Sequence, residues 1–73
     1  MAYIARHRRV LGDSIRKNRK KTGLSQEKLA EKANLHPVYV SAVERGAKTI
    51  SVDNLVRIAK ALKVRPRKFL WKL

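Results

Sequence analysis

The sequence predicts an all-α protein, a compact bundle of five helices in a single domain. Apolar residues recur at helical spacing along most of the chain, and residues that begin or end helices bound each such segment. A third observation is length, because 73 residues support one small core and no second one. We divide the chain into a basic N-terminal arm over residues 1–7, the bundle over residues 8–70 and a tail over residues 71–73.

The first two helices are predicted to run from Arg8 to Thr22 and over about nine residues that follow Ser25. Gly23 ends the first helix, Ser25 is the N-cap of the second, and Asn34 suits the left-handed turn after it. One face of the first helix holds Leu11, Ile15, Arg19 and Thr22, and the inner face of the second holds Leu29, Ala30 and Ala33.

The third helix begins at Pro37, which is favoured at a first helical position, and ends at Gly46. One side of it carries Val40, Val43 and Ala47, and the other side carries Pro37, Val38, Ser41, Ala42 and Arg45. Ser51 caps the fourth helix, whose apolar stripe is Leu55, Ile58, Ala59 and Leu62. A short fifth helix starts at Pro66 and turns Phe69 and Leu70 inward.

The charge of the chain is concentrated at its two ends. The formal net charge is +14, of which residues 1–21 carry +7 and residues 63–73 carry +5. The segment HPVYVSAVERG, residues 36–46, holds one acid and one base. A solvated surface needs a net charge of only about 2 to 8 in magnitude, so contact with phosphates explains the excess better than solubility does.

Several classes of function lack the residues they need. The chain has no cysteine and two histidines, too few for a metal site of cysteine or histidine ligands, and we expect no metal and no cofactor. It pairs no nucleophile with a base and no two carboxylates in a cleft, so we expect no enzyme. No apolar run approaches the roughly 20 residues of a membrane span. We expect a soluble, cytoplasmic protein that binds nucleic acid and no membrane.

Two short helices joined by a tight turn, the second entered through Pro37 and closed by Gly46, have the outline of a helix-turn-helix. The stretch GLSQEKLAEKANLHPVYVSAVERG, followed by ISVDNLVRIAKAL, resembles the Xre-type, phage repressor-like helix-turn-helix family, which includes controller proteins of restriction–modification systems. The elements that match are Arg19 four positions before Gly-Leu-Ser-Gln, Ala30, Val-Ser at 40 and 41, Glu-Arg-Gly at 44–46, and Ile-Ser before the fourth helix. The resemblance covers about residues 11–70 and implies a transcriptional regulator that binds double-stranded DNA.

In this family the third helix, residues 37–45 here, enters the major groove and reads bases from its outer face. The resemblance assigns base reading to Pro37, Val38, Ser41 and Ala42, with His36 at the edge. Many relatives carry Gln, Arg or Thr at the first two positions. With Pro37 and Val38 there, we expect thymine methyl contacts, hydrogen bonds from Ser41 and a larger share for DNA shape. The alternative for Val38 is packing on its neighbours.

The same resemblance, with the anion-binding property of helix N-termini, gives the expected phosphate contacts: Ser25, Gln26, Tyr39, Arg45, Lys48, Thr49, Arg16 and Lys17. Ser25 serves as an N-cap in either case, and Tyr39 either donates to a phosphate or is half-buried. The arm around Arg6, Arg8 and Arg9 follows the DNA backbone or a minor groove, or is disordered. Arg19 and Glu44 correspond to the family's structural salt bridge between the first and third helices.

Family members usually bind as symmetric dimers, so we expect a homodimer. Trp71 and Leu73 are the candidates for a dimer contact, and the alternative for Trp71 is that it covers the end of the domain. Two other functions compete with the sequence-specific regulator. One is a module for a protein partner, such as an antitoxin or a bridging factor, and the other is a general nucleic-acid binder that uses the basic ends.

Overall fold

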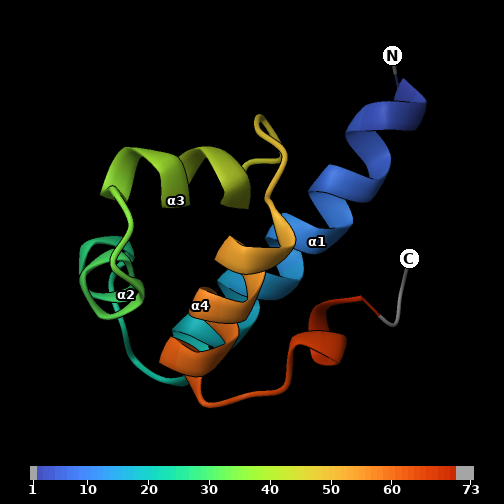
Figure 1. The fold of residues 1–73 in the computed structure, drawn as a ribbon. Helices are drawn as coiled ribbons and strands as arrows, with labels where there is room; N and C mark the ends of the chain where they lie inside the picture. Colours follow the sequence, from blue (N-terminus) through green and yellow to red (C-terminus); the bar gives the residue numbers. More distant parts are fainter. Residues whose placement is uncertain (1, 71–73) are drawn as a thin grey trace.

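The computed structural model of the protein describes residues 2–70, with side chains from residue 6 onward. Its elements are α1 (Ala2–Lys21), α2 (Gln26–Ala33), α3 (Pro37–Glu44), α4 (Val52–Leu62) and the 3-10 helix η1 (Pro66–Phe69). The described residues contain no strand, which confirms the all-α prediction, but they form four α-helices and a 3-10 turn rather than five helices. α2 packs on α4 and α3, α1 packs on α3, and η1 closes against α4 and α1 (Figure 1).

The first helix is longer than predicted. It begins at Ala2, so residues 2–7 continue α1 and do not form an arm ahead of the bundle. Residues 2–11 contain no glycine or proline, and alanine and arginine favour helix, so nothing in this stretch interrupts the hydrogen-bonding pattern. The first turns of α1 extend past the loop between α3 and α4, on the side of the bundle where α3 lies (Figure 1).

A residue with left-handed backbone follows each of the four α-helices within two positions of its last residue. These residues are Gly23, Asn34, Gly46 and Lys63, with φ values between 58° and 75°. In each case the N–H of the next residue donates to a carbonyl five positions back, as in the bond from Leu35 to Ala30 at 2.8 Å. The stops predicted at Gly23, Asn34 and Gly46 are confirmed, while the one at Lys63 is a lysine in a conformation that glycine usually adopts.

The helix starts also follow the sequence closely. The hydroxyls of Ser25 and Ser51 accept the N–H groups of Lys28 and Asn54, at 3.0 and 3.1 Å. These bonds satisfy N–H groups that have no partner within the helix. Pro37 opens α3 as predicted, and the cap before it is His36, which the sequence reading did not expect.

The core lies where the four helices meet and consists of side chains from every element. Its members are Ile15, Leu29, Ala30, Ala33, Val40, Val43, Leu55, Ile58, Ala59, Leu62 and Phe69. Three residues that helical spacing placed inward are instead exposed: Thr22, Ala47 and Leu70. Thr22 and Ala47 follow the last turn of their helices, where helical spacing no longer applies. Leu70 follows a 3-10 helix, whose three residues per turn put Phe69 inside and its neighbour outside.

α1 and α3 lie unusually close together at Gly12. A Cβ atom there would fall 2.3 Å from the carbonyl oxygen of Val43 and 2.7 Å from that of Glu44. No side chain fits at this distance from backbone atoms. Gly12 therefore lets the end of α3 sit directly on the middle of α1, which fixes the direction in which α3 presents its outer face.

Candidate nucleic-acid interface

The outer face of α3 carries the predicted base-reading residues on one solvent-facing surface. Val38 is 66% exposed, and Pro37, Ser41 and Ala42 are partly exposed. The exposure of Val38 argues against the alternative that this side chain packs on its neighbours. This surface has no charged side chain between its ends, so it can make apolar contacts and short hydrogen bonds but no ion pairs.

His36 stands at the N-terminal edge of this face and has a structural role. Its Nδ1 atom accepts the N–H of Val38 at 3.1 Å, so the imidazole is the N-cap of α3. The bond holds the ring against the first turn of the helix. Nε2 is the nitrogen that the cap leaves for another partner.

The N-terminus of α2 opens toward the first turns of α3. One shallow hollow is lined by Arg19 of α1 together with residues from the start of α2 and from α3, namely Ser25, Gln26, Glu27, Pro37, Val38 and Ser41. The Ser25 hydroxyl takes the N–H of Lys28, whereas the N–H groups of Gln26 and Glu27 have no partner among the described residues. Free N–H groups at a helix start carry partial positive charge and bind anions. The two free N–H groups, beside the first turns of α3, are therefore able to bind an anion.

The phosphate assignment of Gln26 concerns its backbone N–H, and its side chain points inward. Its Nε2 atom donates to Glu44 Oε1 at 2.9 Å, which ties α2 to the end of α3. Gln26 can therefore meet a phosphate through its backbone N–H. The sequence reading missed this inward bond because it depends on where Glu44 lies in the folded chain.

Arg19 and Glu44 form a buried salt bridge between α1 and α3. Arg19 Nε and Nη2 donate to Glu44 Oε2 and Oε1 at 2.7 and 3.0 Å, and Nη1 donates to the carbonyl of Leu24 at 2.9 Å. The two side chains are 11% and 2% exposed. Together with Gln26, this network fixes α3 relative to both α1 and the N-terminus of α2.

The predicted phosphate contacts on α1 and at the C-terminal end of α3 lie in two separate places. Arg16 and Arg45 line one hollow between α1 and the end of α3. Lys17 lies elsewhere on α1, in a hollow it shares with Lys21 and Lys68, and it pairs with Asp13 at 3.1 Å. The structure therefore brings Arg16 to the α3 side of the molecule but does not bring Lys17 there.

Tyr39 is partly buried on the side of α3 that meets α4. Its hydroxyl accepts the Asn54 amide at 3.1 Å, and Lys48 Nζ lies 5.9 Å from its ring centroid. The hydroxyl proton remains available as a donor, so partial burial and phosphate contact are compatible. Lys48 and Thr49 are exposed in the loop that follows α3.

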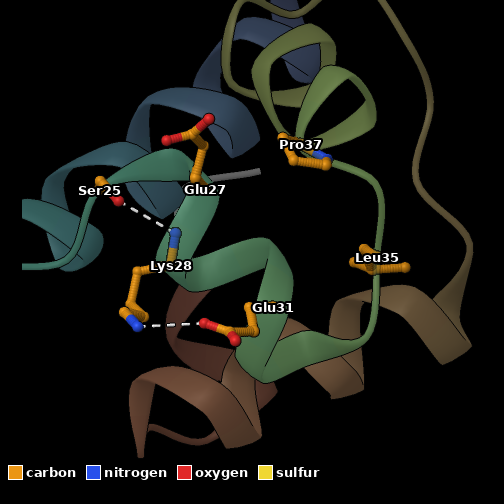
Figure 2. A pocket seen from close by; sticks show the side chains of 6 residues that line it. All are labelled: Ser25, Glu27, Lys28, Glu31, Leu35 and Pro37. Atoms are coloured by element: carbon orange, nitrogen blue, oxygen red, sulfur yellow. Dashed lines mark hydrogen bonds and ion pairs between the residues drawn. The ribbon is translucent and has the colours of Figure 1, made fainter.

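A second hollow beside α2 is acidic in part and does not suit a phosphate. Figure 2 shows its lining, with Glu27 and Glu31 on the outer surface of α2 and Leu35 and Pro37 across from them. Lys28 pairs with Glu31 at 3.1 Å, which leaves Glu27 without a cation among the described residues. Glu27 is thus an acid in the first turn of α2, beside the free N–H groups of that helix.

The remaining points concern the dimer candidates, a membrane span and a metal site. Trp71 and Leu73, the candidates for a dimer contact, lie outside the described residues. Within residues 2–70, no helix is both long and apolar enough to cross a membrane. The same part of the chain holds no group of three or more potential metal-ligating side chains.

Comparison with known proteins places this geometry in a family. The helix-turn-helix family model matches residues 15–69. The chain belongs to this family. The Xre-type resemblance read from the sequence is thereby confirmed, and the protein is a DNA-binding transcriptional regulator.

Similar proteins include controllers of restriction–modification systems. The control protein C.BamHI of Bacillus amyloliquefaciens is 44% identical over 64 residues, which span 86% of this chain and 79% of that protein. The crystal structure of the restriction–modification controller C.AhdI from Aeromonas hydrophila superimposes with a TM-score of 0.84 at 39% identity, over 85% of this chain and 94% of that one. The regulator SinR, solved in complex with DNA, gives 0.80 at 33% identity over 82% and 97%.

Proposed function

We propose that the protein is a sequence-specific regulator that places α3 in the major groove of double-stranded DNA and reads bases with Pro37, Val38, Ser41 and Ala42. The observation that carries the proposal is the outer face of α3, which is uncharged, solvent-facing and rigidly held in a strongly basic molecule. Exposure of an apolar valine side chain to water is unfavourable, and contact with a thymine methyl group in the groove would remove that surface from water.

The dimensions of α3 suit this placement. Its eight residues make a helix about 12 Å long, close to the width of a major groove of B-DNA. The start of α2, with its free N–H groups, lines a hollow together with Pro37, Val38 and Ser41 from the first turns of α3, and Arg45 follows the last residue of α3. Phosphates on the two walls of the groove would thus meet donors at both ends of the helix.

We also propose that the protein binds as a homodimer. One α3 reaches only a few base pairs, and two copies related by a twofold axis would read half-sites about 34 Å apart. The likeness to SinR, whose structure is a complex with DNA, supports binding to duplex DNA. The relatives include restriction–modification controllers and other regulators, so they support gene regulation in the cytoplasm and leave the regulated genes open.

Selection of bound duplexes from a random pool, repeated at two salt concentrations, tests the proposal. We expect one motif with two spaced half-sites at both concentrations. A steep salt dependence without a motif would instead identify a general nucleic-acid binder, because phosphate contacts carry no sequence information. A specific protein partner combined with weak binding to every duplex would identify a partner-binding module.

A further inference from the structure

Four arginines surround one hollow where the first half of α1 meets the end of α3. Arg6, Arg9 and Arg16 come from α1, and Arg45 is the C-cap of α3. The hollow has a volume of about 550 Å³ and is also lined by Val10, Asp13 and Glu44. Arg6 and Arg9 precede residue 15, where the match to the family model begins. This chain therefore adds two cations to the end of α3 from outside the matched segment.

The positive charge of this arginine hollow is not compensated by its own acids. Asp13 pairs with Lys17 at 3.1 Å, and Glu44 pairs with Arg19 at 2.7 Å. The guanidinium groups of the four arginines have no hydrogen bond or ion pair with any side chain described between residues 6 and 70. Like charges held together repel one another, so an anion in the hollow would be attracted by all four.

Two glycines hold the hollow in a fixed shape. Gly46 has a φ of 75°, and a Cβ atom there would lie 2.8 Å from Arg9 Cγ and 3.1 Å from Arg9 Cα. Gly12 allows the same close approach one turn further along α1. The backbone of α1 therefore rests directly on the end of α3 and on the turn after it. The arginines of α1 are therefore carried by a helix whose backbone is in contact with the end of α3 and the turn after it.

From this arrangement we infer that the arginine hollow binds a backbone phosphate of the DNA strand beside the C-terminal end of α3, a role that rests on the proposed function. The first turns of α1 then form a second DNA-contacting element, which contributes affinity and alignment but no base reading. All four cations are arginines, whose planar guanidinium groups match phosphate oxygens in pairs. A DNA strand is the favoured source of that phosphate because Arg45 belongs to the helix that the groove would hold.

The test removes two charges from the hollow and two from a matched place elsewhere. The variant is Arg6→Gln/Arg9→Gln, in which glutamine preserves helix propensity. The control is Arg65→Gln/Arg67→Gln, which removes two exposed arginines at η1, away from α3 in Figure 1. Thermal melts by circular dichroism check that each variant remains folded. Dissociation constants for the selected duplex and for a random duplex are then measured by fluorescence anisotropy over a range of KCl concentrations.

We expect Arg6→Gln/Arg9→Gln to lose about tenfold or more in affinity for both duplexes, the loss that one charged hydrogen bond implies. The slope of log K against log [KCl] should become shallower by about 0.9 for each lost phosphate contact, with the selected motif unchanged. The control should retain the wild-type slope. Equal losses in both variants, or no loss in either, would overturn the inference, and a changed motif would show base reading instead.

Two further results distinguish this inference from the proposed function and from binding of a free phosphate ion. If the wild-type protein binds duplexes without any motif, the proposed function fails, yet the slopes on random DNA still test the arginine hollow. Inorganic phosphate, titrated at constant ionic strength, distinguishes a DNA strand from a free anion. Saturable displacement of DNA that disappears in Arg6→Gln/Arg9→Gln, combined with an unchanged DNA slope, would assign the hollow to free phosphate and overturn the inference.

Discussion

Replacing Arg19 with methionine should destabilise the fold severely while leaving its aliphatic packing in place. The substitution removes three hydrogen bonds, two to Glu44 and one to the carbonyl of Leu24. It strands a carboxylate that is 2% exposed, with the amide of Gln26 as its remaining donor. Breaking a buried ion pair from one side costs about 3 to 5 kcal/mol. Because Gln26 still donates to Glu44, we expect a loss near the lower value, about 3 kcal/mol.

Urea denaturation followed by circular dichroism at 222 nm measures the free energy of unfolding. For a chain of this size, about 3 kcal/mol corresponds to a fall in Tm of roughly 12 to 24 °C. Lys17→Met is the matched control. It breaks the ion pair between Lys17 and Asp13 on the same helix, and these two side chains are 67% and 53% exposed. Such exposed pairs contribute about 0 to 1 kcal/mol.

A second variant separates the stranded charge from the lost hydrogen bonds. In Arg19→Met/Glu44→Gln the buried group is neutral, so part of the stability should return, by at least about 1 kcal/mol. If Arg19→Met unfolds within about 1 kcal/mol of the wild type, or no more easily than Lys17→Met, the reasoning about the buried pair is refuted.

Three further predictions concern single residues. Gly12→Ala should lower the free energy of unfolding by about 3 kcal/mol, because the new methyl group would meet the carbonyl oxygen of Val43 at 2.3 Å. Helix propensity alone predicts the opposite, a rise of about 1 kcal/mol in the free energy of unfolding, so a rise measured by urea denaturation would contradict this prediction. Glu27→Gln should tighten DNA binding about two- to fivefold at 0.1 M salt, because it removes a carboxylate beside the free N–H groups of α2. An unchanged dissociation constant in an anisotropy titration would count against a phosphate at these N–H groups. Arg8→Met should raise stability by about 1 kcal/mol, because Arg8 Nε is buried without a hydrogen-bond partner within the described residues; a lower Tm would contradict this.

Features of the fold that depend on local chemistry could be predicted from the sequence. Ser25 and Ser51 cap helices because their hydroxyls reach N–H groups three positions ahead, and Asn34 takes the left-handed turn because its strain there is small. Lys63 takes the same conformation although no local signal favours it. The left-handed backbone there lets the N–H of Val64 donate to the carbonyl of Ala59 at 3.0 Å, which closes the end of α4.

Contacts between distant segments have no local signal, and the Arg19–Glu44 pair was expected through the family resemblance alone. The need for Gly12 has no local signal, because the Val43 carbonyl oxygen that a Cβ atom would meet at 2.3 Å belongs to another helix. The bond from the Gln26 amide to Glu44, 18 residues later, has no signal in the sequence around Gln26. The outer face of α3 could be predicted from the sequence, because the helix begins at Pro37 and one of its sides is neutral, which separates inner from outer residues. Its function as a base reader remains a prediction.

Duplex selection with Val38→Gln tests the central claim most directly, that the outer face of α3 discriminates between DNA sequences. Glutamine changes no charge and can pair with an adenine edge through two hydrogen bonds. Val52→Gln is the control, since Val52 is 75% exposed on α4 and Val38 is 66% exposed on α3. We predict that Val38→Gln selects an altered motif, with adenine newly preferred at one position in each half-site, while Val52→Gln selects the wild-type motif. A Val38→Gln variant that folds, binds and selects the wild-type motif would contradict the account.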